Sequence, residues 1–80
     1  NLYKMNKQKF IAELSEELLI ETDVTLDTKF KELDEWDSMG AMMLIGYVSD
    51  NFEVVLNADD IDSLTTIQSL IQKIGNEKFS

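Results

Sequence analysis

The chain contains no cysteine, no histidine and no proline, and only three glycines among its 80 residues. Without cysteine there is no disulfide, no thiolate metal ligand and no thiol within the protein itself. Without histidine the chain lacks the usual general base and the commonest neutral metal ligand. The scarcity of proline and glycine favours helices over a β fold, which needs many turns.

Positive charge is also scarce, because seven basic residues stand against sixteen acidic ones and leave a formal net charge of −9. A chain of this sign is poorly suited to nucleic acids, whose phosphates need basic partners. No apolar run approaches the roughly 20 residues of a membrane span, and no secretory signal is visible. We therefore expect a cytoplasmic monomer that binds no nucleic acid and spans no membrane.

The length is that of one small domain, which we place at residues 5–80. Residues 1–4 are expected to be a remnant of expression. A first helix is predicted to begin after Asn6, a suitable N-cap, and to end near Leu19 or Ile20. Its apolar residues have the spacing of one helical face: Phe10, Ile11, Leu14 and Leu18.

Residues 21–37 form a long connection after this helix. Loops of this length are uncommon in small domains and are usually functional or pinned to the core. We expect Phe30 and Leu33 to pin this one. Its acidic residues do not follow the order of a calcium-binding loop, so they are interpreted as a solvated surface.

The second predicted helix begins at Ser38, with Asp37 as its N-cap. No residue from Ser38 to Ser49 is charged, although the rest of the chain is strongly acidic. One apolar set has the spacing of a core stripe: Ala41, Leu44, Ile45, Val48 and Phe52. A second apolar set lies beside it: Met39, Met42, Met43 and Tyr47. Because so small a domain cannot bury both sets, the second is predicted to face solvent.

The rest of the chain predicts one short helical turn over residues 58–61, capped by Asn57, and a last helix that ends at Gly75. Thr65 and Gln68 have the spacing of a capping box for that last helix. Its inward residues are Ile67, Leu70, Ile71 and Ile74. The predicted fold is therefore all-α, a small bundle of three main helices and one short helix, with a long loop between the first two.

The residues offer little catalytic chemistry. A serine nucleophile needs an adjacent base, yet histidine is missing and no G-x-S-x-G turn is present. No glycine-rich phosphate loop is present either. An enzyme is therefore not expected. Ser38 has another possible use, because a hydroxyl at the first turn of a helix can be modified by another enzyme, and the helix N-terminus favours a phosphate there.

The order of several segments resembles the acyl carrier protein family. The similar segments are Asp37-Ser38-Met39, Asn51-Phe52-Glu53-Val54, Ala58-Asp59-Asp60-Ile61 and Leu64-Thr65-Thr66-Ile67. The resemblance implies that Ser38 receives 4′-phosphopantetheine from coenzyme A and that the thiol of this arm carries an acyl or aminoacyl group as a thioester. It further implies two kinds of partner, a phosphopantetheinyl transferase and an acyl ligase or acyltransferase.

The sequence departs from the family at positions that partner enzymes recognise. Members that serve fatty acid synthesis usually carry acids along the second helix, where this chain has Gly40, Met43 and Ser49. We therefore expect a carrier dedicated to one pathway, making a specialised lipid, a polyketide-like product or a modified sugar. Glu35 and Trp36 replace the two glycines common before the serine of peptidyl carriers, which favours the acyl branch.

Several roles stay open at this point. Asp37 acts as a cap alone or also in recognition by the modifying enzyme. Trp36 anchors the loop or lies at the partner surface. Met39, Met42, Met43 and Tyr47 form a partner surface or cover the core. In relatives, an apolar acyl chain can enter the core between the helices. The corresponding core residues expected here are Ala41, Leu44, Ile45, Val48, Ile61, Ile67, Leu70 and Ile71. The alternative function is a helical protein–protein interaction module without a prosthetic group.

Overall fold

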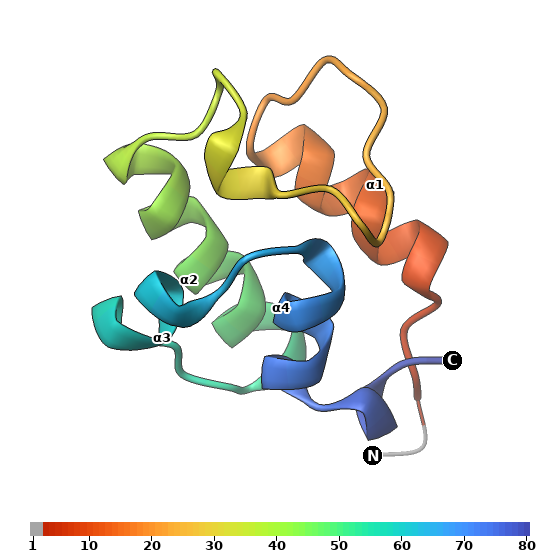
Figure 1. The fold of residues 1–80 in the computed structure, drawn as a ribbon. Coiled ribbons are helices and arrows are strands. Elements are labelled where there is room, and N and C mark those ends of the chain that lie inside the picture. Colours follow the sequence, from red (N-terminus) through yellow and green to blue (C-terminus); the bar gives the residue numbers. More distant parts are fainter. Residues whose placement is uncertain (1–2) are drawn as a thin grey trace.

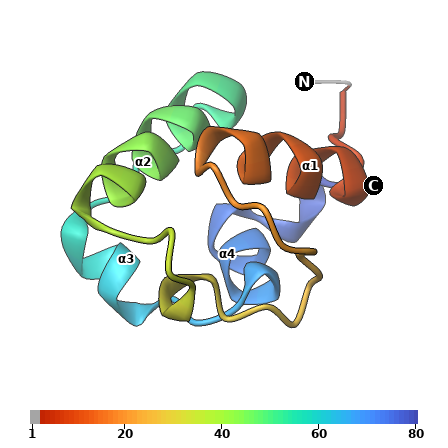
Figure 2. The ribbon, with the colours of Figure 1, turned by 90° about the horizontal axis from the view of Figure 1, so that it is seen from above.

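A computed structural model describes residues 3–80 and shows four α-helices within them. They are α1 (Lys7–Glu17), α2 (Ser38–Phe52), α3 (Ala58–Ser63) and α4 (Ile67–Ile74), with short 3-10 helices η1 (Phe30–Glu32) and η2 (Asn76–Lys78). These described residues form no β-strand, so the all-α prediction is confirmed. Helices α1 and α2 lie next to each other, and α4 packs beneath them (Figures 1 and 2).

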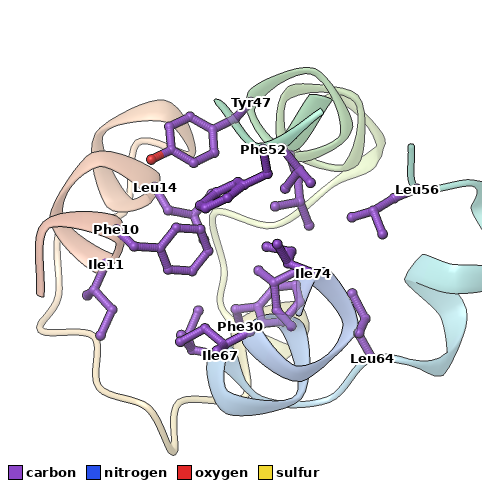
Figure 3. Packing of buried hydrophobic residues seen from close by; sticks show 14 of the residues in the cluster. Phe10, Ile11, Leu14, Phe30, Tyr47, Phe52, Leu56, Leu64, Ile67 and Ile74 are labelled. Atoms are coloured by element: carbon purple, nitrogen blue, oxygen red, sulfur yellow. The ribbon is translucent and has the colours of Figure 1, made fainter. Parts of the chain in front are cut away.

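The hydrophobic core lies between α1, α2 and α4, and the long loop covers part of it. An aromatic cluster fills one end of this core, where the ring of Phe10 lies 5.1 Å from Phe79 and 5.8 Å from Phe52. Figure 3 shows Tyr47 beside Phe10 and Phe52, with Ile67 and Ile74 of α4 below these rings. Burial of these apolar side chains is the main favourable contribution to the stability of the fold.

The two ends of the described chain meet at the same side of the domain (Figure 1). Met5 and Phe79 form an isolated parallel bridge, in which the Met5 N–H donates to Lys78 O at 3.0 Å. Met5 therefore belongs to the fold. The expectation that residues 1–4 are a remnant falls partly on residues 1 and 2, which lie outside the described residues.

The loop between α1 and α2 is pinned by its backbone as well as by its side chains. The N–H groups of Ile67 and Gln68 donate to the carbonyls of Thr28 and Leu26, at 3.1 and 2.9 Å. The loop thus satisfies N–H groups in the first turn of α4 that have no partner within the helix. Phe30 is fully buried, as predicted, and Leu33 is half-buried against the core.

Helix α3 is held from two sides. Lys31 in η1 donates from Nζ to the carbonyls of Ile61 and Asp62, at 2.8 and 3.1 Å, so a lysine caps the C-terminal end of α3. On the other side, Lys73 of α4 lies 3.1 Å from the Asp60 carboxylate. A hydrogen bond from the Asn57 backbone and the neighbouring Lys73 both lower the pKa of Asp60.

The predicted caps are confirmed with one error, whereas α1 ends at Glu17, before the predicted Leu19 or Ile20, and α3 runs to Ser63, beyond the predicted residue 61. Asn6 and Asn57 cap α1 and α3, and Gly75 follows α4 with a positive φ of 127°, as predicted. The predicted capping box of Thr65 and Gln68 is wrong, because the observed box joins Thr66 and Ser69. The Gln68 N–H is already bonded to the loop, and Ser69 is one residue later and short enough to bond back to the cap.

Candidate functional site

Ser38 is the first residue of α2 and is exposed. The cap before it is the predicted one, because Asp37 Oδ1 accepts a hydrogen bond from the Gly40 N–H at 2.8 Å. The backbone of Asp37 is extended, so the helix starts sharply at Ser38. The structure gives Ser38 Oγ no hydrogen-bond partner among residues 3–80, and its hydroxyl is therefore available to an approaching enzyme.

The segment before Ser38 is fixed by an aromatic contact. The ring of Trp36 meets that of Phe30 edge to face, with 5.2 Å between the ring centroids. Trp36 also covers Gly40, since a Cβ at that glycine would lie 3.4 Å from Trp36 Cε3 and 3.7 Å from Leu18 Cδ2. Trp36 is half-buried and anchors the loop under the first turn of α2, which supports one of the two alternatives for this residue.

The methionines near Ser38 face solvent. Met39 is 69% exposed, Met42 is 71% exposed and Met43 is 42% exposed. Figure 2 shows that the outer side of α2 is turned away from α1 and α4. A group of exposed apolar side chains beside an exposed serine has the composition of an interaction surface.

The prediction that Tyr47 also faces solvent is wrong. Its side chain is 7% exposed, and its hydroxyl donates to Glu13 Oε1 of α1 at 2.7 Å. The cause is that α2 packs against α1 as well as α4, which turns the buried arc of α2 toward Tyr47. Burial, followed by the hydrogen bond to Glu13 and the charges of Glu13 and Glu17, raises the pKa of Tyr47 well above its usual value of about 10.

Because the buried side of α2 is turned toward Tyr47, two residues of the predicted core stripe lie outside the core. Ala41 and Ile45 are only half-buried, at the edge of the core and not inside it. The other residues considered for an acyl cavity are all buried in a single cluster, and they are Leu44, Val48, Ile61, Ile67, Leu70 and Ile71. Most of this predicted set therefore forms the packed core of the protein.

Two hollows occur at opposite ends of α2. The larger, of about 830 Å³, lies where residues 3–6 meet the C-terminal end of α2, and its lining mixes Lys9 and Lys78 with Asp50 and Glu53. The smaller, of about 280 Å³, is mostly apolar and lies between the end of α1 and the start of α2. Only the smaller hollow adjoins the immediate neighbours of Ser38, so the larger one has no part in chemistry at this serine.

Sequence reasoning missed the structural roles of three residues. Lys31 lies on the solvated loop, and nothing in its neighbourhood indicates a partner 30 residues away. Glu13 reads as an ordinary surface acid of α1, although it accepts from Tyr47. Leu19 takes the left-handed position after α1, and nothing in the local sequence indicates this, because glycine is the usual residue there.

Within residues 3–80, no helix is long and apolar enough to cross a membrane. No group of acidic side chains in that same range gathers closely enough to hold a metal ion. The described part of the site thus consists of one exposed serine, its capping aspartate and the apolar surface beside them.

Comparison with known proteins gives one match. Residues 8–74 match the family model described as the phosphopantetheine attachment site. This range contains α1, the loop, α2, α3 and α4. No curated protein and no solved structure matches the chain with significance.

Proposed function

Because the chain belongs to the phosphopantetheine attachment family, whose members are non-catalytic carriers of 4′-phosphopantetheine, we propose that Ser38 carries the arm. The observation behind this proposal is the exposed hydroxyl of Ser38 at the start of α2, directly after a capping aspartate. The arm supplies a thiol, which this chain lacks because it contains no cysteine.

The residues around Ser38 fit such a group. The first N–H groups of a helix lack partners inside the helix, and with the helix dipole they favour a phosphodiester at this end. Asp37 uses its carboxylate on the Gly40 N–H, so it holds the first turn in shape and keeps Ser38 at the surface. The acids that precede Ser38 give a basic transferase a charged surface to approach.

The test is the intact mass of the protein after incubation with coenzyme A and a broad-specificity phosphopantetheinyl transferase. We expect a gain of one phosphopantetheine in the natural protein and none in Ser38→Ala. Ser49→Ala is the matched control, because Ser49 is also an exposed serine of α2, and this variant should gain the arm normally. Loss of modification in Ser49→Ala, or gain in Ser38→Ala, contradicts the proposal.

We further propose that the carrier serves a dedicated biosynthetic pathway and meets its partners through Met39, Met42 and Met43. The exposed part of α2 holds these apolar side chains, and Met43 stands where carriers that serve fatty acid synthesis usually have an acid. Apolar contact predicts that loading by the pathway's ligase or acyltransferase depends weakly on salt, whereas an acidic surface loses affinity steeply as charges are screened.

Met42→Glu tests this surface, and Val55→Glu is its control. Both side chains are strongly exposed, at 71% and 81%, but Val55 lies in the loop after the far end of α2. We expect Met42→Glu to raise the apparent KM for loading without lowering the melting temperature, and Val55→Glu to change neither. Equal loading by both variants would exclude Met42 from the interface.

The cargo is proposed to be an acyl group, and an apolar one is proposed to enter the core lined by Leu44, Val48 and Ile71. This core is closed in the structure, so entry requires its side chains to separate. A group that binds only the folded state stabilises that state. Loading a medium-length fatty acyl chain should therefore raise the melting temperature, and an unchanged or lower value indicates a cargo held in solvent.

A further inference from the structure

The smaller hollow is a groove bounded by the end of α1 and the first turns of α2. Leu18 and Leu19 come from the end of α1, and Met39 and Met43 come from α2. Gly40 lies between them, and because it has no side chain Leu18 and Trp36 pack closely against it, 3.7 and 3.4 Å from where its Cβ would lie. The volume of about 280 Å³ lies just below the roughly 300 to 1,000 Å³ of typical small-molecule sites.

Leu19 is an unusual residue for its position in this groove. The Ile20 N–H donates to Ser15 O at 2.9 Å and the Leu19 N–H donates to Glu16 O at 3.2 Å, which is the pattern of a Schellman motif. Such a motif usually has glycine where this chain has Leu19, whose φ is +58°. Leu19 is also 77% exposed. An apolar side chain that is both strained and exposed suggests a role outside the stability of the domain.

The edge of the groove carries only one sign of charge. Its three charged lining residues are Glu17, Glu35 and Asp37, and no lysine lines it. The Glu35 carboxylate already accepts a hydrogen bond from the Glu21 N–H at 3.3 Å, which fixes it at this edge. An occupant must therefore carry no negative charge in the groove, and it fits best with apolar groups for the leucines and methionines and N–H donors for the carboxylates.

We propose that this groove is the resting site of the pantetheine part of the arm when the arm carries no cargo, an inference that rests on the proposed function. Pantetheine is uncharged, has two geminal methyl groups and offers two amide N–H donors, which are properties that fit the groove. Attachment to Ser38 brings the pantetheine close to the groove, because Asp37 and Met39, the two neighbours of Ser38 in the chain, both line it. An arm that rests there is covered on one side by the protein until a partner draws it out.

The experiment uses the full chain, loaded with the arm and labelled for nuclear magnetic resonance. We expect cross-peaks between the geminal methyl protons of the arm and the methyl groups of Leu19 and Met43. Loading should also shift the amide signals of Leu19 and Gly40. Leu19→Asn removes the apolar wall but suits a positive φ, so it keeps the fold. Val55→Asn is the matched control, because Val55 is equally exposed, at 81%, and does not line the groove.

Leu19→Asn should lose the cross-peaks and most of the amide shifts, and Val55→Asn should keep both. Intact mass, measured first, separates the two proposals: if no arm is added at Ser38, the proposed function fails and this inference fails with it. If the arm is added but its methyl groups show no contact with Leu19 or Met43, only the groove inference is overturned. Cross-peaks to Ile45 and Ile61 in their place, or contacts that survive in Leu19→Asn, overturn it equally.

Discussion

The hydrogen bond between Tyr47 and Glu13 is expected to stabilise the folded protein. Tyr47→Phe removes the hydroxyl that donates to Glu13 Oε1 at 2.7 Å and keeps the ring in its place, 6.0 Å from Phe10. A hydrogen bond to a charged group contributes about 1.5–3 kcal/mol. Since the Glu13 side chain is 39% exposed and regains water, we expect a loss near the lower limit, about 1–1.5 kcal/mol.

The pH dependence separates this hydrogen bond from simple packing. The pKa of Tyr47 is higher in the folded state than in the unfolded state, so its contribution is fully present below about pH 10 and is lost as pH rises further. At pH 11 the unfolded state gains about 1.4 kcal/mol by ionising this tyrosine, which the Phe variant cannot do. The natural protein should therefore lose most of its advantage over Tyr47→Phe between pH 9 and pH 11.

The assay is urea unfolding of both proteins, followed by circular dichroism at pH 8, 9, 10 and 11. The difference between the two free energies of unfolding is the quantity of interest, since other titrations affect both proteins alike. A difference that stays constant up to pH 11 would show that Tyr47 does not hold its proton against Glu13. Equal stability at pH 8 would show that the hydroxyl contributes nothing in the folded state.

Three further changes test the local structure, each by thermal or urea unfolding. Asp37→Ala should cost about 0.5–2 kcal/mol, while Asp37→Asn should keep the stability; a normal rate of modification in Asp37→Asn would show that Asp37 is only a cap. Leu19→Gly should stabilise the unloaded domain by about 0.5–1 kcal/mol, because relief of the left-handed strain exceeds the added chain entropy, and a destabilised variant refutes that strain. Lys31→Met should cost about 1–2 kcal/mol by leaving two carbonyls of α3 without their donor, and an unchanged melting temperature would show that water replaces the lysine.

Local signals in the sequence predicted most of the fold. Asn6, Asp37 and Asn57 each precede a helix and cap it, because a side-chain oxygen can accept from a first-turn N–H wherever the chain turns into a helix. The helices themselves follow from apolar spacing, which local residues determine. The start of α2 at Ser38 was therefore predictable, and with it the position of the candidate site.

The errors come from contacts between segments far apart in the chain. Periodicity shows that α2 has apolar residues on more than one side, but it does not show that α1 covers the side with Tyr47. The capping box of α4 lies one residue later than predicted because the Gln68 N–H is used by Leu26, 42 residues earlier in the chain. The groove beside Ser38 depends on the left-handed turn at Leu19, which no local pattern fixes to that residue.

The proposed carrier function depends most on the identity of the modified serine. The most direct measurement is fragmentation mass spectrometry of the natural protein after loading with phosphopantetheine. We predict that the fragments place the whole mass gain on Ser38, within the sequence Asp37-Ser38-Met39. A gain located on Ser49 or any other serine, or a protein that gains no mass at all, would contradict the account.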